Sequence, residues 1–372
     1  MLSPLVNGTP VLIRYLHPLR TASCRDSAAD VGYTVINFNT ALQTLRCITS
    51  LTQCSDPPLW ITVLDNASSQ QDFDALQAGL QAANFSHIQL FRSETNLGFA
   101  AGSNFLVDQL LADTNCYYIG LLNNDAVAMP ALIGLLTNAL QSSPIPVGLA
   151  GGRMHKLSEP QLVDTLGISV YASLMPADRH NVEDPFLGPT GGCCMMTRDF
   201  IQDIIGSTGY FFDPRYFCYC EDTDLVLRAA LLGYKAVYVD ELVALHEGQA
   251  SSSTQSDDFI AYHGLRNAIW MHCKFMPTRV LIKHVGWLFL AHTMTIVRQT
   301  LSGRAAVMYR VYRDAFRQWP SMLKERTNFK KLVRVAPSEL YNVIAPRFYR
   351  KGYAALVLRG WMQRVKPTGN AP

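Results

Sequence analysis

Acidic and amide side chains follow apolar runs in this sequence at positions where they could hold a charged ligand. Asp65 ends the run WITVL, and Asn123, Asn124 and Asp125 follow the run YYIGLL. Carboxylate and amide oxygens suit Mg²⁺ or Mn²⁺, and such an ion can bridge a diphosphate. Because the second cluster has a single carboxylate, the site needs a further ligand. His246 could supply it as a neutral imidazole, although a lone histidine is more often structural.

Three carboxylates, Glu221, Asp222 and Asp224, open a predicted helix. Acids in a first turn commonly only complement the helix dipole or cap the helix. Here, however, the preceding run FFDPRYFCYC is rich in aromatic residues. Such surroundings can desolvate a carboxylate and raise its pKa towards the range of a useful general base. The surroundings therefore favour a general base among these three carboxylates over a purely structural role.

Small and amide residues form a second type of candidate site. The stretch NLGFAAGSN contains Asn96, Gly98, Gly102 and Asn104 just before or within a predicted helix. Backbone N–H groups at a helix start can face a phosphate or a sugar hydroxyl. An ordinary loop capped by Ser103 or Asn104 would give the same pattern, and Asp65 alone could equally be a helix cap or turn residue.

The elements that must position these residues alternate between strands and helices from residue 31 onward. Strands are predicted at 31–37, 60–64, 87–91, 117–122 and 236–239, and helices at 40–52, 73–83, 102–112, from about 131 to 140, and 222–232. This alternation predicts an α/β fold with a sheet covered by helices. Because ligands collect at the carboxyl ends of strands in open α/β sheets, Asn37, Asp65 and Asp125 are expected to lie where a nucleotide site would be built. The stretch around Gly151-Gly152 and Gly191-Gly192 is expected to be less regular.

The composition fits a folded protein with an uneven distribution of charge. The 372 residues are 49% hydrophobic and 16% charged, which excludes a disordered chain. Residues 1–273 hold 13 Lys/Arg against 26 Asp/Glu, whereas residues 274–372 hold 19 against 3. A basic tail of this kind suggests a polyanionic partner, either nucleic acid or an anionic membrane surface.

The tail contains an apolar stretch, Val280–Val297, interrupted by Lys283, His284 and His292. It is marginal in length and purity for a membrane span. We expect interfacial helices on an anionic membrane surface, with arginines on the phosphates. A basic helical subdomain packed on the body is the alternative. Nucleic acid is not expected as a partner, since no recognised binding motif accompanies the charge.

The N-terminus and the cysteines bear on the compartment. Residues 1–30 have no signal-peptide pattern and are expected to be an extension outside the fold. Nine cysteines form no C-x-x-C pair and no zinc-ligand spacing, so we expect buried thiols in a reducing cytosol. The expected organisation is an extension at 1–30, a catalytic domain at 31–255 and a helical, basic region at 256–372.

The order of the motifs along the chain is more specific than any one of them. DNAS, NLGFAAGSN, LLNND, GGCCMMTRDF, EDTDL and H-x-G follow one another between residues 31 and 272. This order resembles the GT-A fold family 2 glycosyltransferases, and within them the bacterial rhamnosyltransferase-like branch. The resemblance implies a Rossmann-like, mixed, mostly parallel sheet with helices on both faces, followed here by the basic helical region.

The resemblance also implies roles for the candidate residues. Asp222 resembles the family's base, which removes a proton from the acceptor hydroxyl, and Asp65 resembles its reader of uracil or thymine. Asp125 and His246 resemble the ligands of a divalent cation, Mg²⁺ or Mn²⁺. The remaining predicted contacts are those to the nucleotide sugar, Asn37, Asn39, Asn96, Gly98, Gly102, Asn104, Asn123 and Asn124, and those on the acceptor side, Gly191, Gly192 and Asp224.

The implied reaction is an inverting sugar transfer. The donor would be a dTDP- or UDP-sugar, with dTDP-rhamnose as the first candidate, and the acceptor a lipid-linked saccharide or surface polysaccharide. A cytoplasmic protein, peripheral on the inner face of the plasma membrane, would fit such an acceptor. Asn123 departs from the family's D-x-D pattern, in which its position is acidic. The rival hypothesis is a catalytically degenerate module that binds a nucleotide or sugar and scaffolds polysaccharide assembly.

Overall fold

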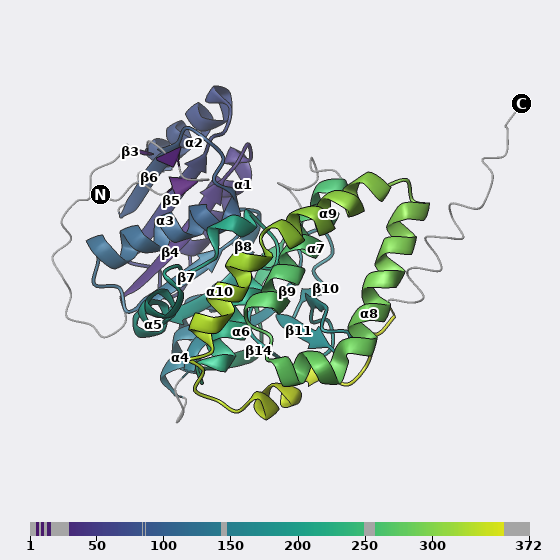
Figure 1. The fold of residues 1–372 in the computed structure, drawn as a ribbon. Coiled ribbons are helices and arrows are strands. Elements are labelled where there is room, and N and C mark those ends of the chain that lie inside the picture. The colour runs from purple at the N-terminus through teal and green to yellow at the C-terminus, as the bar shows by residue number, and fades with distance from the viewer. Residues whose placement is uncertain are drawn as a thin grey trace, which may run out of the picture.

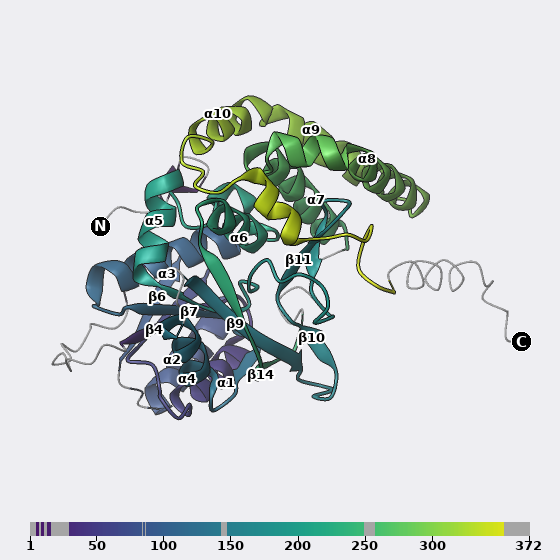
Figure 2. The ribbon, with the colours of Figure 1, turned by 90° about the horizontal axis from the view of Figure 1, so that it is seen from below.

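The computed structural model describes residues 30–83, 85, 87–142, 147–248 and 257–352, together with three short strands near the N-terminus, β1 (Leu5–Val6), β2 (Thr9–Pro10) and β3 (Ile13–Tyr15). A large mixed sheet forms the centre of the molecule, and helices cover both of its faces (Figure 1). A group of C-terminal helices forms a further layer over one of these faces (Figure 2).

The ten-stranded sheet has the order β3-β6-β5-β4-β7-β13-β9-β14-β8, with β10 paired to β9. Apart from the edge strand β3, which is antiparallel to β6, its first half is parallel, since β4 pairs with β5 and β7 and β5 pairs with β6 in that sense. The second half is largely antiparallel, apart from the parallel pair of β9 and β14. The strands are β4 (Val31–Asn37), β5 (Trp60–Asn66), β6 (Ile88–Ser93), β7 (Tyr118–Leu122), β8 (Ala126–Ala128), β9 (Val147–Lys156), β10 (Val163–Thr165), β13 (Cys193–Thr197) and β14 (Lys235–His246). The predicted α/β fold with a mixed sheet is confirmed.

Two hydrophobic cores lie on opposite faces of this sheet. Alternation along β13 divides its side chains between them, since Cys193 and Met195 join one core and Cys194 and Met196 the other. The first core is covered by α1 (Ala41–Thr52), α2 (Gln70–Ala83) and α4 (Leu132–Gln141), and the second by α3 (Gly98–Asp113), α5 (Arg198–Thr208) and α6 (Glu221–Leu231). The cysteines of β13 are therefore buried thiols, as expected.

The middle of the chain is more regular than its sequence indicates. The glycine-containing stretch expected to be irregular includes β9 through β13, with β11 (Ile168–Tyr171) and β12 (Pro176–Asp178) in a separate small sheet. Gly152 allows close packing there, because a methyl group at its Cα would lie 2.5 Å from Val243. The edge strand β3 pairs with β6, so this part of residues 1–30 joins the sheet. Strands β1 and β2 pair with each other in a separate two-stranded sheet, and the other residues before residue 30 lie outside the described ones.

The C-terminal helices are α7 (Asp257–Lys274), α8 (Thr278–Leu301), α9 (Ala305–Arg317) and α10 (Trp319–Phe329). Trp270 of α7, Ala315 of α9 and Met322 of α10 pack around Tyr216 of the body. After a 3₁₀ turn at Pro337–Asn342, β15 (Ile344–Ala345) pairs with β11. Most of this region therefore packs on the body, which agrees with the alternative of a packed helical subdomain.

Helix α8 differs from its neighbours because it extends away from the body (Figures 1 and 2). It has 24 residues and is long and apolar enough to cross a membrane, judged by length and composition alone. Its large exposed apolar side chains are Ile282, Val285, Trp287, Phe289, Leu290, Met294, Ile296, Val297 and Leu301. The helix thus exposes a long apolar surface that the remaining described residues leave uncovered.

A buried ionic cluster joins the end of α7 to the start of α6. The Lys274 ammonium lies 2.7 Å from Asp213 and 2.8 Å from Asp224, and Arg228 donates to Asp224 at 2.7 Å. All four side chains are fully buried. Removing one partner of such a cluster would leave an uncompensated buried charge, so the loss of any one member would be strongly destabilising.

Candidate active site

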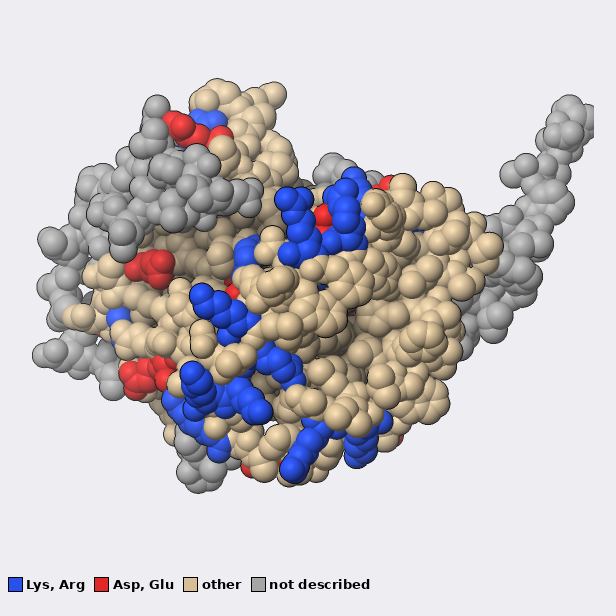
Figure 3. All heavy atoms as spheres, in the orientation of Figure 1, with Lys and Arg blue, Asp and Glu red and all other residues tan. Residues whose placement is uncertain are grey.

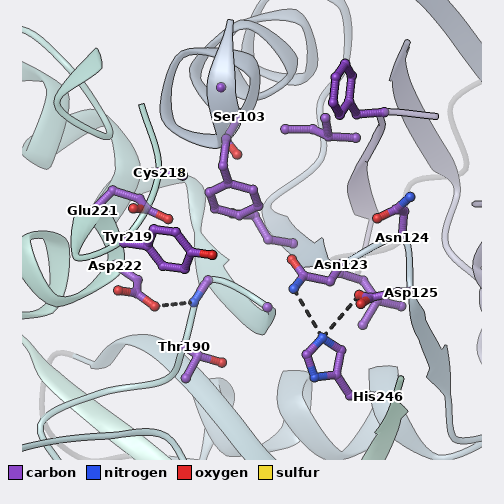
Figure 4. A pocket seen from close by; sticks show the side chains of 18 of the residues that line it. Ser103, Asn123, Asn124, Asp125, Thr190, Cys218, Tyr219, Glu221, Asp222 and His246 are labelled. Atoms are coloured by element: carbon purple, nitrogen blue, oxygen red, sulfur yellow. Dashed lines mark hydrogen bonds and ion pairs between the residues drawn. The ribbon is translucent and has the colours of Figure 1, made fainter. Parts of the chain in front are cut away.

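A cavity of about 460 Å³ lies at the carboxyl ends of β4 and β7. Its walls come from the turn after β7, the loop before β13, the start of α6 and the end of β14 (Figure 4). This is the edge at which ligands collect in open α/β sheets. The cavity therefore occupies the place where the strand-end residues are expected to meet.

Asn123 and Asn124, in the turn after β7, make different contacts. The backbone N–H of Asn123 donates to the Gly192 carbonyl at 2.8 Å, which ties this turn to the loop before β13. The Asn124 side-chain amide instead donates to the hydroxyls of Thr40 and Thr44, at 2.6 and 2.9 Å. Asn124 borders the cavity, but its amide nitrogen holds the start of α1 in place.

His246 lies beside Asp125 because β14 pairs with β8, so that His246 is opposite Ala126. Its Nε2 is 3.1 Å from Asp125 Oδ1 and 3.4 Å from the Asn123 side-chain nitrogen. On the other side of the ring, Nδ1 is 2.7 Å from Oδ2 of Asp164. The pairing of β14 with β9 is irregular after Val239, and these irregularities set which face of the sheet His246 occupies.

The two carboxylates determine the charge of this imidazole. Burial alone would lower the pKa of His246, but the hydrogen bonds with Asp125 and Asp164 raise it to about 10. In the cation-free protein, the imidazolium therefore bridges the two carboxylates. Asp164, on β10, belongs to no motif in the sequence, and only the pairing of β10 with β9 brings it here.

Across the cavity, α6 begins with Glu221 and Asp222 (Figure 4). Asp222 accepts hydrogen bonds from the backbone N–H of Gly191 at 3.2 Å and from that of Thr223 at 2.6 Å. Burial raises the pKa of Asp222, although these hydrogen bonds oppose the shift. Burial and the charge of Asp222 raise the pKa of Glu221 well above its usual range, and its Oε2 has no hydrogen-bond partner among the described residues.

The loop that leads into α6 is held in an unusual backbone conformation. Phe217, Tyr219 and Cys220 have φ of 66°, 68° and 66° in the left-handed region, which non-glycine residues rarely adopt. The side-chain amide of Asn267, on α7, lies 3.0, 2.9 and 2.8 Å from the carbonyl oxygens of residues 216, 218 and 219. Asn267 therefore fixes the strained loop that carries Asp222. No motif identifies it in the sequence.

Glycines leave room for the other side chains of the cavity. A methyl group at Gly191 would lie 3.1 Å from the Phe99 ring and 3.5 Å from Asp222 Cβ, and one at Gly192 would lie 3.2 Å from Asn123. Gly98 has φ of 73°, and a methyl group there would meet the Phe217 carbonyl oxygen at 2.5 Å. All three glycines line the cavity, as does Asn96.

Several backbone N–H groups at the start of α3 already donate hydrogen bonds to acceptors in the protein. Asn96 accepts from the Gly98 N–H at 2.8 Å, and Asn66 accepts from the Leu97 N–H at 2.8 Å. The Ala100 N–H donates to the Phe217 carbonyl at 3.0 Å. These donors are committed to protein acceptors, so contacts of this loop with a phosphate stay a prediction.

Three other predicted contact residues, Asn37, Asn39 and Asp65, do not line the cavity. Asp65 is 0% exposed and accepts from the Asn37 side chain at 2.9 Å, while Arg92 lies 3.3 Å from its other oxygen. Asn39 accepts from the Ser69 N–H at 2.8 Å. A base-reading role for Asp65 requires these polar contacts to rearrange, and it stays a prediction.

Three further candidates contact protein rather than the cavity. Gly102 packs near Ile36, where a methyl group would lie 3.0 Å from its Cδ1. Asn104 exchanges two hydrogen bonds, both 2.8 Å, with the backbone of Phe212. Asp224 is fully buried in the ionic cluster described above. Their predicted contacts with donor or acceptor also stay predictions.

Asp178 is a carboxylate in the cavity that the sequence does not indicate. It ends β12 and lines the cavity together with Asp222 and Asp164. Partial desolvation in the cavity and the charges of Asp222 and Asp164 raise the pKa of Asp178, although its side chain is exposed to solvent. The cavity is therefore strongly acidic near the start of α6.

Comparison with known proteins places the chain among glycosyltransferases. Residues 29–261 match the model of the family described as Glycosyltransferase like family 2. Two curated relatives from two strains of Mycobacterium tuberculosis are each 26% identical over 290 residues, which is 71% of this chain and 88% of theirs. Both are named N-acetylglucosaminyl-diphospho-decaprenol L-rhamnosyltransferase.

Solved structures agree on the fold. Residues 1–349 of S. aureus TarS in complex with UDP-GlcNAc align with a TM-score of 0.52 and 12% identity, over 82% of this chain and 90% of that one. GalNAc-T7 with UDP, GalNAc and Mn²⁺ aligns with a TM-score of 0.50 and 12% identity, over 71% of this chain and 50% of that one. At these identities the likeness shows a common GT-A-type fold alone.

Proposed function

Since the chain belongs to the glycosyltransferase-like family 2 and is a glycosyltransferase, we propose that it transfers a sugar with inversion from a dTDP- or UDP-sugar to a hydroxyl of a lipid-linked saccharide or surface polysaccharide. Rhamnose is the first candidate sugar, supported by the curated rhamnosyltransferase relatives. The observation that carries the proposal is the arrangement of one cavity, with Asp222 on one side and the Asp125–His246 pair on the other (Figure 4).

Asp222 acts as the general base in this proposal. Its raised pKa makes it a better proton acceptor than an exposed aspartate, and the Gly191 N–H fixes its carboxylate. As the acceptor oxygen attacks the anomeric carbon, Asp222 takes the hydroxyl proton and the nucleoside diphosphate leaves with the bonding electrons. Burial and the charge of Asp222 raise the pKa of Glu221, which favours its neutral form beside the base.

The donor diphosphate lies beside Asp125 and His246 in this proposal. These two side chains fit a divalent cation, since an oxygen and an imidazole nitrogen 3.1 Å apart can bind one ion together. The described residues contain no group of three or more candidate ligands, so diphosphate oxygens and water would complete the coordination. A bound Mg²⁺ or Mn²⁺ would neutralise the charge of the leaving diphosphate. Asp164 would orient His246 through Nδ1.

The location proposed for the protein is the inner face of the plasma membrane, as a peripheral protein. Lys and Arg side chains gather over the C-terminal helices, whereas the end of the molecule formed by α8 is drawn almost entirely in tan (Figure 3). The exposed apolar side chains of α8 could enter the lipid while neighbouring cations contact phosphate groups. This arrangement would bring the cavity to a lipid-linked acceptor.

A degenerate binding module is the second candidate function. It is favoured by Asn123, whose uncharged amide faces His246 where the family pattern has an acid. Such a module would bind a nucleotide sugar without releasing the nucleotide.

The test is a panel of UDP-, dTDP- and GDP-sugars incubated with the full chain and Mn²⁺, with release of the nucleoside diphosphate measured. Slow hydrolysis of one dTDP- or UDP-sugar, accelerated by a saccharide acceptor, is the expected result. Binding without any release across the panel would instead support the module and overturn the proposed transfer.

A further inference from the structure

A second and larger cavity, of about 1280 Å³, adjoins the active site. It shares Asp178, Tyr219, Glu221, Asp222 and Ile260 with the first cavity, so the two meet at the proposed base. Small-molecule sites usually enclose about 300–1,000 Å³. This cavity therefore has room for a ligand longer than a sugar.

The walls of this second cavity are mainly apolar. They are formed by β12, the segment 348–350 and the helices α7, α8 and α9. Among the apolar lining residues are Met175, Leu265, Ala291, Met294, Val297 and Met308. The cavity also reaches Met294, Val297 and Leu301, which belong to the exposed apolar surface of α8. The cavity thus connects the proposed base to that surface.

Positively charged side chains also line this cavity. Arg298, Arg304 and Arg350 line the cavity, and ion pairs with Asp257 and Asp258 already occupy Arg304. Arg350 is near Asp178, since its charge opposes the increase in that carboxyl's pKa. A cationic wall therefore begins beside the carboxylates of the active site.

We propose that this second cavity, hereafter the acceptor groove, binds an isoprenoid diphosphate that carries the acceptor saccharide. The saccharide lies at Asp222, the diphosphate lies against Arg350 and Arg298, and the isoprenoid chain runs along α7 and α8 to the apolar surface. The proposal rests on the proposed function, and it adds a binding site for the lipid part of the acceptor. Apolar walls and positive charge match an amphiphilic anion of this kind.

The direct test measures binding without catalysis, using farnesyl diphosphate as the probe. Calorimetric titration of the full chain is carried out with UDP in excess, so that the diphosphate is kept from the donor cavity. Farnesol, which has the same chain without the charge, is titrated in parallel. Farnesyl diphosphate is expected to bind at least about tenfold more tightly, because only the diphosphate can accept charge-assisted hydrogen bonds from the arginines.

Charged substitutions on α8 test whether farnesyl diphosphate binds in the acceptor groove. Met294→Glu and Val297→Glu alter groove residues that are 50% and 52% exposed, so the fold should tolerate them. Each is expected to weaken farnesyl diphosphate binding about tenfold or more, because a carboxylate would face the apolar chain and the anionic probe. The matched controls are Ile282→Glu and Phe289→Glu, on the same helix but outside the groove. They should bind the probe like the wild type.

Arginine substitutions test the charged part in the same way. Arg350→Ala and Arg298→Ala should weaken farnesyl diphosphate but not farnesol, and Arg279→Ala, outside the groove on α8, should change neither. Groove variants that bind the probe as tightly as their controls would overturn the proposal. UDP binding and nucleotide-sugar hydrolysis, measured on the same proteins, report on the donor cavity, so failure of the groove can be told apart from failure of the proposed function.

Discussion

Asp164 Oδ2 lies 2.7 Å from Nδ1 of His246, on the side of the ring opposite Asp125. This contact fixes the ring orientation and the nitrogen that faces the cavity. In the proposed function, this orientation would direct Nε2 towards the divalent cation once the Nε2 proton is lost.

Replacing Asp164 by Asn should weaken the binding of Mn²⁺. An amide orients the ring less strongly than a carboxylate and makes Nε2 less basic, and losing such a partner typically costs about 10- to 100-fold in metal affinity. Titration of Mn²⁺ in the presence of UDP, followed by electron paramagnetic resonance, measures this affinity. An affinity equal to that of the wild type would contradict the role given to Asp164.

Asp222→Asn should abolish most of the transfer while UDP binding stays intact. The amide fits the same space beside Gly191 but cannot take the acceptor proton, and base catalysis contributes about 10²- to 10⁴-fold. Initial rates with the best donor and acceptor, together with the Kd for UDP, provide the test. Transfer within a few-fold of the wild-type rate would exclude Asp222 as the base.

Asn267→Leu should lower kcat more than it changes the KM for the donor. The variant keeps a side chain of similar size but loses the amide that holds three carbonyls of the strained loop before α6. Strain of about 1–3 kcal/mol per left-handed residue then favours relaxation of the loop and displaces Asp222. Steady-state kinetics of the two variants Asn267→Leu and Asn267→Gln would test this, with partial recovery expected for Gln. Equal kcat for wild type and Leu would argue against a positioning role.

Gly98→Ala should destabilise the protein, whereas Gly206→Ala should not. Gly98 has φ of 73°, and its new methyl group would meet the Phe217 carbonyl oxygen at 2.5 Å. Gly206 lies within α5, where a methyl group would have no heavy atom within 4 Å, so alanine should add about 0.4–1 kcal/mol of stability. Urea unfolding of both variants measures the difference. Equal effects would mean that the contact at Gly98 relaxes without cost.

The charge of His246 predicts a pH dependence of stability in the cation-free protein. Its pKa is about 10 when folded, above the usual value of about 6.5 for an unfolded chain. The resulting stabilisation is fully present below about pH 6.5 and is lost as the pH rises towards 10. Urea unfolding in EDTA at pH 6.5 and 9.5 should show this loss, and His246→Gln should reduce it. If His246→Gln lost as much stability between pH 6.5 and 9.5 as the wild type, other groups would be the cause of the loss.

The first half of the fold follows from its sequence pattern because the strands there are apolar and their helices are amphipathic. β4 matches its expected range, and α1 begins one residue later than predicted. Strands β9 to β12 have no clear sequence signal because they depend on long-range pairing, and glycines in β9 hide the pattern. Helix α3 starts at Gly98 rather than Gly102, since the Phe217 carbonyl accepts a hydrogen bond from its first turn.

The candidate site is only partly predictable from the sequence, because long-range pairing brings some of its residues together. Asp222, Asp125 and His246 can be found because each follows or begins a recognisable element. Asp164 and Asp178 lie on short strands, and Asn267 lies within a long helix, so only tertiary pairing brings them to the active site. Asp65 illustrates the converse: a polar residue at a strand end can be satisfied inside the protein, as its contact with Asn37 shows.

The irregular pairing of β14 after Val239 has a consequence for how this chain can vary in length. Side chains alternate between the two faces of a strand, so one residue deleted between Val239 and Leu242 would turn His246 away from Asp125. Substitutions on the exposed side of this stretch do not change which face of β14 the later residues occupy. Single-residue insertions and deletions there would therefore be more damaging than most changes of side chain.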